Sequence, residues 1–416
     1  MLSRRVFLKN SGFALVSLGF APSFLTRTAY AQGRNGRPKQ LIAIFQRGAV
    51  DGLSVVVPFG EAEYYRVRPT IAIGQPGSSA DAAISLDGFF GLNPRLSPLK
   101  PFWDQKALAI VHACGSPNAT RSHFDAQDYM ETATPGVKTT ADGWLNRYLQ
   151  VRKTEHDAAF RAVALTPQMP RMLQGAAPAI AMNQISQFNI RPGNNGVTSA
   201  GATFESLYAD AKDRVLGSAG RDAFDAMKAL KSADPSRYEP EHGADYPRTP
   251  FGQALKQIAQ LVKADVGLEV AFADAGGWDT HVNQGSSQGQ LATRLDDFAR
   301  GIAALVLDLG DRMADTVVLT MSEFGRAVSE NGNRGTDHGH GNAMMAMGGG
   351  VRGGKVYGRW PGLTSDRRYE GRDLAVTTDF RDVFGEIVVR HLGVQDPRPI
   401  FPGYDVNAAR FPGLFA

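Results

Sequence analysis

The sequence predicts a single large α/β domain, a three-layer sandwich in which a mostly parallel sheet carries helices on both faces. Four short, continuous apolar runs end directly in polar or glycine-bearing loops, which is typical of buried parallel strands. An amphipathic stretch joins the last two runs through short connections, as a right-handed crossover helix does. The chain has 416 residues and one cysteine, Cys114, so a large core and not a disulfide must stabilise it.

The predicted elements follow one another along the chain. The four strands are expected at 40–45, 107–113, 267–273 and 316–321. The crossover helix has an apolar face that includes Leu291, Leu295, Phe298 and Ile302. Helical spacing also predicts helices at 204–231, 250–263 and 379–392. Residues 160–250 are expected to form a mixed insertion or cap on the sheet, with short strands at 162–165 and 179–182 and a turn at 193–196.

The first 31 residues predict a twin-arginine signal peptide. Arg4 and Arg5 are followed by Val, Phe, Leu and Lys, and then by an apolar stretch over 12–25 that is too short to span a bilayer stably. Ala29-Tyr30-Ala31 reads as a cleavage site. We therefore expect a mature periplasmic or secreted protein without a stable membrane anchor, with the twin-arginine translocase as its partner during export.

The charge pattern gives no indication of nucleic-acid binding, and no such partner is expected. The formal charge of +4 comes entirely from four basic residues of the predicted signal, which contains no acidic residue. The mature chain is then neutral overall, and it has no run of lysine and arginine interleaved with aromatic residues.

Acidic residues and histidines gather in the loops that follow the predicted strands. In open α/β sheets, ligands bind beyond the carboxyl ends of the strands. Carboxylate and imidazole groups are suitable ligands for zinc, manganese, calcium or magnesium. Alternate residues of an extended chain point the same way, so Asp-x-His and His-x-His pairs can each face one ion. The sequence thus predicts a divalent metal site from Asp51, Asp279, His281, Glu323, Asp337, His338 and His340.

A second group of candidates begins a predicted helix. Ser122 and Asp125 fit a capping box, which is a purely structural role. The same position would suit a nucleophile, because the free backbone N–H groups of a helix N-terminus bind anions. Arg121 could hold an oxyanion, and His123 could donate a proton or bind the substrate.

Several segments together resemble a bacterial family, the domain of unknown function 1501. They are FQRGAVDGLSVVVP, RSHFDAQDYMET, GGWDTH, MSEFGR and GTDHGHGN, and they span nearly the whole mature chain. That family is similar in turn to the alkaline phosphatase and sulfatase superfamily. The resemblance implies an alkaline phosphatase-like sandwich with a two-metal site and a nucleophile at a helix N-terminus, the place of Ser122.

The chain also departs from the superfamily pattern. Glu323-Phe324 stands where the superfamily has an Asp-His pair, which removes one imidazole ligand. Cys114 lacks the following Pro and Arg of the sulfatase formylglycine signature, so that chemistry is not expected. The predicted function is metal-dependent hydrolysis of a small or polymer-borne anionic ester, of phosphate or sulfate. The alternatives are phosphotransfer at the same site, or a non-catalytic metal- or anion-binding protein of the envelope.

Overall fold

The computed structural model describes residues 37–152, 160–185 and 238–416. The predicted signal at 1–31, the helix at 204–231 and the turn at 193–196 lie outside these residues. Within the described part, no helix has the length and apolar character needed to cross a bilayer.

The predicted α/β class is confirmed. The described residues form a nine-stranded main sheet with the order β11-β5-β10-β9-β1-β8-β6-β7, and β12 pairs with β5. Every strand runs in the same direction except β10, which lies antiparallel between β5 and β9. The strands are β1 Gln40–Gln46, β5 Leu108–Gly115, β6 Ala162–Ala164, β7 Ile180–Ala181, β8 Val270–Ala275, β9 Thr316–Met321, β10 Asn342–Gly348, β11 Lys355–Tyr357 and β12 Thr378–Asp379.

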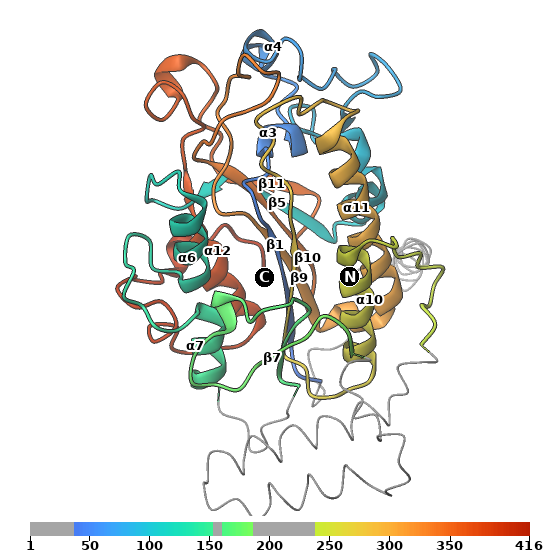
Figure 1. Ribbon diagram of the computed structural model, residues 1–416, viewed down its shortest axis with the longest axis vertical. Helices are drawn as coiled ribbons and strands as arrows, with labels where there is room; N and C mark the ends of the chain where they lie inside the picture. The colour runs from blue at the N-terminus through green and yellow to red at the C-terminus, as the bar shows by residue number, and fades with distance from the viewer. Residues whose placement is uncertain (1–36, 153–159, 186–237) are drawn as a thin grey trace, which may run out of the picture.

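Helices cover both faces of this sheet, as Figure 1 shows, so the fold has three layers. α10 (Pro250–Lys263) and α11 (Gln290–Leu309) pack on one face, and α6 (His123–Thr132), α7 (Trp144–Val151) and α12 (Phe380–Glu386) pack on the other. Alternate residues of β1 supply the two cores: Ile42 and Ile44 face α10 and α11, whereas Leu41 and Ala43 face α7 and α12.

A small antiparallel sheet lies beyond the main one, in the order β2-β4-β3. Its strands are β2 (Val56–Val57), β3 (Ile84–Ser85) and β4 (Gly91–Leu92). The short helix α3 (Gly52–Val55) precedes β2, α4 (Ala62–Val67) connects β2 to β3, and α5 (Lys100–Asp104) precedes β5.

Most predicted elements are present, with shifted ends. The strand expected at 267–273 begins at Val270, because Gly267 has a left-handed φ of 80° that ends the preceding turn. The strands expected near 162–165 and 179–182 are β6 and β7, which extend the sheet itself. The helix expected at 379–392 changes after Glu386 into a π-helical turn, Ile387–His391.

The arrangement of strands determines where the functional residues meet. β1, β5, β8 and β9 are parallel, so the loops after their last residues emerge at one edge of the sheet. β10 runs the other way and therefore begins at that edge, which brings residues 337–341 to the same place.

Candidate metal centre

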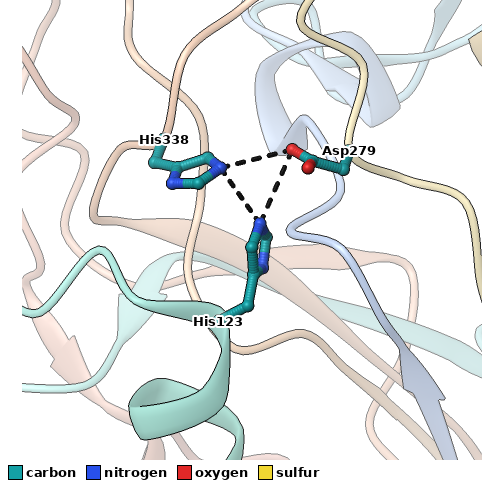
Figure 2. A group of neighbouring side chains, drawn as sticks. All are labelled: His123, Asp279 and His338. Atoms are coloured by element: carbon teal, nitrogen blue, oxygen red, sulfur yellow. Dashed lines mark hydrogen bonds and ion pairs between the residues drawn. The ribbon is translucent and has the colours of Figure 1, made fainter.

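Three imidazole rings and one carboxylate converge at the carboxyl edge of the sheet. The Nε2 atom of His338 lies 3.0 Å from the Nε2 atoms of both His123 and His281. The Oδ1 atom of Asp279 lies 3.0 Å from His281 Nε2, 3.3 Å from His338 Nε2 and 3.5 Å from His123 Nε2. Figure 2 shows His123, Asp279 and His338 pointing toward one another from three separate segments.

Each segment is held by local structure that the sequence explains. His123 is the first residue of α6, which Ser122 caps by accepting a hydrogen bond from the Asp125 backbone N–H. The loop carrying Asp279 and His281 bonds to the loop carrying His338, for instance from Thr336 N–H to the Thr280 carbonyl. Gly335 permits this approach, since a Cβ there would lie 2.2 Å from the His281 carbonyl oxygen.

The second nitrogen of each ring has an acceptor of its own. His123 Nδ1 lies 2.8 Å from Glu323 Oε1, and His281 Nδ1 lies 3.0 Å from Asp337 Oδ1. His338 Nδ1 lies 2.9 Å from the backbone carbonyl of Arg121, which can only accept. These partners place the proton of each neutral ring on Nδ1. The Nε2 lone pairs of His123 and His281 then both face His338 Nε2 and the Asp279 carboxylate.

This geometry fits a metal ion. Three nitrogen lone pairs and a carboxylate oxygen repel one another unless a cation or proton lies between them. Ligand atoms bound about 2.0–2.1 Å from one tetrahedral ion are roughly 3.3–3.4 Å apart, close to the separations of 3.0–3.5 Å seen around His338 and Asp279.

The charges around the site keep its carboxylates ionised. Burial would raise the pKa of Asp279, but Arg326, whose Nη2 atom lies 2.6 Å from Oδ1, holds that pKa below its ordinary value. Burial likewise opposes ionisation of Glu323, and the hydrogen bonds from His123 and Gln127 keep its pKa low. The pKa of Asp337 is lowered by hydrogen bonds from Asn331 and His281.

The pKa values of His123 and His338 are displaced in opposite directions. The hydrogen bond to Glu323 raises the pKa of His123. Burial, followed by the charge of His123, lowers the pKa of His338.

Three predicted metal ligands contact the ligand histidines or lie beside them without joining the cluster. Glu323 is fully buried and bonds to the outer nitrogen of His123, and Asp337 bonds to the outer nitrogen of His281. A carboxylate that accepts from the outer nitrogen of a histidine is the usual partner that orients such a ring toward a metal. His340 stacks on Tyr369 with ring centroids 4.6 Å apart, and its buried ring has a lowered pKa.

Asp51 lies one layer behind the cluster. Arg68 donates to both of its carboxylate oxygens, at 2.5 and 3.1 Å. Ser54 and Gln284 donate to Oδ2 as well, at 2.6 and 2.8 Å. The carboxylate is completely buried. Burial alone would raise its pKa, but the charge and hydrogen bonds of Arg68 outweigh this effect, so the pKa of Asp51 is below its ordinary value. The structure therefore gives Asp51 a cation already and does not bring it to the metal centre.

The three predicted catalytic residues, Arg121, Ser122 and His123, lie in different environments. His123 faces the cluster as one of its converging rings, and so it joins the candidate metal ligands. Ser122 is exposed at the N-cap of α6, as the capping-box interpretation predicts. The guanidinium of Arg121 is engaged by Asp373 and Glu370, at 2.6 and 2.9 Å, so it is not a free anion clamp.

Two further residues support the site: Arg326, which the sequence offers as an ion-pair partner or an anion contact, and Gln127, which the sequence does not single out. Arg326 is buried and donates to Asp279 and to the backbone carbonyls of Ala49 and Thr336. Its bond to Asp279 gives Arg326 the first of these two roles. Gln127 donates to Glu323, and it lies four residues after His123 on the same face of α6.

Comparison with the curated proteins gives no match. Two solved structures are similar to this chain. One is a protein in the alkaline phosphatase superfamily from Vibrio parahaemolyticus, with 10% identity and a TM-score of 0.38, over 88% of this chain and 69% of that one. The other is the PsFucS1 sulfatase from Pseudoalteromonas sp., with 12% identity and a TM-score of 0.39, over 93% of this chain and 74% of that one.

The family resemblance predicted from the motifs is confirmed. The family model described as protein of unknown function (DUF1501) matches residues 107–383, which is more than half of the chain. This region includes His123, Asp279, His281 and His338. The chain therefore belongs to the DUF1501 family.

Proposed function

We propose that this protein is a metal-dependent hydrolase of a phosphate or sulfate ester, with a divalent metal held by His123, Asp279, His281 and His338. The observation that carries this proposal is the convergence of three Nε2 lone pairs on one carboxylate oxygen, with the outer nitrogen of every ring bonded to its own acceptor. A solvated cluster of charged groups has no reason to hold all three rings in this orientation.

The ligand set favours zinc. Imidazole nitrogen binds zinc well, whereas calcium and magnesium prefer sites made of oxygen atoms. The Nε2 atoms of His123 and His338 and the Oδ1 atom of Asp279 lie within 4.8 Å of one another and so could share one zinc ion, and His281 Nε2 lies 3.0 Å from two of these three atoms. Of the metals expected from the sequence, zinc and manganese thus remain the candidates.

The site is open to solvent, which supports a catalytic rather than a structural ion. The side chains of Asp279 and His281 are 44% and 39% exposed. Structural zinc sites are closed, and catalytic sites leave a position free for water or substrate. A zinc ion bound here would polarise an ester oxygen and lower the pKa of bound water.

The chain itself supplies a candidate nucleophile beside the cluster. The Ser122 hydroxyl accepts from the Asp125 N–H at 3.4 Å, which leaves its own proton free. The hydroxyl stands at the N-terminus of a ten-residue helix, where the helix dipole favours an approaching anion. We propose that the Ser122 oxygen attacks the phosphorus or sulfur atom while its proton passes to solvent, and that the ester oxygen leaves and takes up a proton as the alcohol. Water then hydrolyses the phosphate or sulfate ester of Ser122 and restores the hydroxyl.

A second candidate function has one observation in its favour. Arg121 already pairs with Asp373 and Glu370, so the site offers no free guanidinium to bind an oxyanion. A protein of the envelope that only binds the metal would need no such group. Phosphotransfer differs only in the acceptor of the phosphoryl group, and it uses the same residues.

Elemental analysis of the mature protein, purified without chelator, tests the metal site. We expect about one equivalent of zinc or manganese, which is lost in His281→Ala. Ester hydrolysis that disappears in Ser122→Ala with metal content unchanged would support the nucleophile. Stoichiometric metal without turnover on phosphate and sulfate esters would favour the binding protein, and folded protein without metal would refute both metal-based readings.

Export by the twin-arginine pathway is part of the proposal, since it delivers proteins that fold before transport. Fractionation of cells that produce the full chain and an Arg4→Lys, Arg5→Lys variant tests it. We expect the periplasmic form to disappear in the variant, and an unchanged distribution would contradict the export route.

A further inference from the structure

We propose that Gln127 and Arg47 are positioning residues that fix the orientation and tautomer of His123 through Glu323. This inference rests on the proposed function only in its use of the metal as a reporter. His123, Gln127 and Glu131 lie four residues apart and so form one polar face of α6. That face is directed at the sheet, where Arg47 and Glu323 follow β1 and β9.

The hydrogen bonds of this face allow one assignment of donors and acceptors. Arg47 can only donate, so its Nη1 atom, 2.9 Å from Gln127 Oε1, fixes which end of the amide is oxygen. The Gln127 Nε2 group must then point to Glu323 Oε1, at 2.9 Å. Glu323 Oε1 also receives the Gly48 backbone N–H at 2.8 Å, which marks it as an acceptor. His123 Nδ1 consequently donates to it, and Nε2 is left as the lone pair that faces the cluster.

The far end of this chain is anchored. Arg47 Nη1 donates to Glu131 Oε1 at 2.9 Å, and its Nε atom donates to Asp274 Oδ2 at 2.9 Å. The guanidinium also lies over the Phe45 ring, 4.5 Å from the centroid. Glu131 is buried, and its other oxygen accepts from the Met172 N–H. Arg47 therefore cannot rotate without breaking several contacts, and its fixed guanidinium holds the Gln127 amide in one orientation.

Gln127→Glu separates positioning from mere packing. Glutamate keeps the volume of Gln127 and gains a charged bond to Arg47, so a packing role would survive the change. It cannot donate to Glu323, however, and it places a second acceptor beside that carboxylate. Gln127→Leu removes both bonds. The matched control is Gln150→Glu on α7, because Gln150 Nε2 also donates to a carboxylate, that of Asp142 at 2.8 Å.

Two measurements on the mature protein test the inference. The first is zinc affinity, measured by competition with a chromophoric chelator. It should weaken about 10–100-fold in Gln127→Glu and Gln127→Leu, as for other residues that support metal-binding histidines. In the control Gln150→Glu it should stay within about threefold of wild type. Long-range ¹H–¹⁵N correlation spectra of histidine-labelled, metal-free protein report the tautomer directly. We expect the Nδ1–H form at His123 in the wild type, identified by its loss in His123→Gln, and a mixture of forms in both Gln127 variants.

A Gln127→Glu protein with the wild-type His123 tautomer would overturn the inference, whatever its zinc affinity. If the wild type binds no zinc, the proposed function fails, and the spectra of the metal-free protein still decide whether Gln127 positions His123.

Discussion

Replacing Asp51 by asparagine should destabilise the fold and spare the metal site. Asp51 is fully buried, and it pairs with Arg68 at 2.5 Å. Removing one partner of a buried ion pair costs about 3–5 kcal/mol, because the other charge is left uncompensated. Arg68 keeps its bonds to the carbonyls of Ala327 and Val328, so we expect a loss near ~3 kcal/mol, the lower end of that range.

The loss should be measurable by heating or by urea. With about 2.1 cal/mol/K per residue, unfolding a chain of 416 residues changes the entropy by roughly 0.9 kcal/mol/K. A loss of ~3 kcal/mol then lowers the Tm of the metal-free protein by about 3 °C. Zinc affinity should change less than about threefold, because Asp51 contacts none of the converging atoms.

Asp279→Asn is the matched control, since it changes the carboxylate that does face the three rings. We expect zinc affinity to fall more than about tenfold there. The opposite result in Asp51→Asn would refute the structural role assigned to Asp51. In that case the variant would lose zinc binding, while its metal-free form would still unfold cooperatively at the same urea concentration as wild type. Asp51 would then be a metal ligand.

Three further predictions concern pH, a glycine and the metal. Burial lowers the pKa of His112 and His391 to about 4, so these two histidines take up protons more readily in the unfolded chain as the pH falls. The free energy of unfolding should therefore decrease between about pH 6.5 and 4, by on the order of 2–3 kcal/mol for each histidine. A urea midpoint that does not change over this pH range would contradict this prediction. Gly48→Ala should weaken zinc binding, because the φ of Gly48 is +112° and the new Cβ would lie 2.8 Å from the Asp279 backbone nitrogen. The control Gly77→Ala should not weaken it, since φ is also positive there, at +83°, but no atom lies within 4 Å of the new Cβ. Zinc at a hundredfold excess over Kd should add about 2.7 kcal/mol of stability, seen as a Tm rise that a chelator reverses; no change would argue against a site in the folded state.

The sequence predicted the fold well where the apolar pattern is strong. β1, β5 and β9 are rich in Val, Ile, Leu and Ala, and each was expected within a residue or two of its observed bounds. β10 was not predicted, although it lies in the middle of the sheet. Its sequence, NAMMAMG, lacks the β-branched and aromatic residues that favour strands. β10 is a strand because it pairs with β5 and β9, which lie far from it in the sequence.

The site was predicted in part, and the errors share a physical origin. Asp279, His281 and His338 were chosen because they follow strands and alternate along the chain, and the structure brings them together. Asp51 also follows a strand. Gly48 and Ala49, however, have left-handed φ values of 112° and 59°, which redirect the chain before it reaches Asp51. Spacing along a sequence carries no information about such turns.

His340 shows the same limit of reasoning from alternation. It lies two residues after His338, and extended geometry would place both rings on one side. Gly339 packs so closely on the Arg326 backbone that a Cβ would lie 2.2 Å from its carbonyl carbon. The chain then enters β10, and the His340 ring stacks on Tyr369 instead. Neither contact can be inferred from the local sequence, because both involve residues distant along the chain.

The charges that touch the converging groups explain why a divalent ion suits this site. Asp279 belongs to the cluster, Glu323 bonds to His123, and Asp337 bonds to His281, and hydrogen bonds or a guanidinium hold the pKa of all three carboxyls low. Arg326 is the cation bonded to Asp279. Three negative groups and one positive group around three neutral rings leave a formal charge of about −2. A divalent cation neutralises that charge, whereas a single shared proton would leave half of it, and the three inward lone pairs give the cation its ligands.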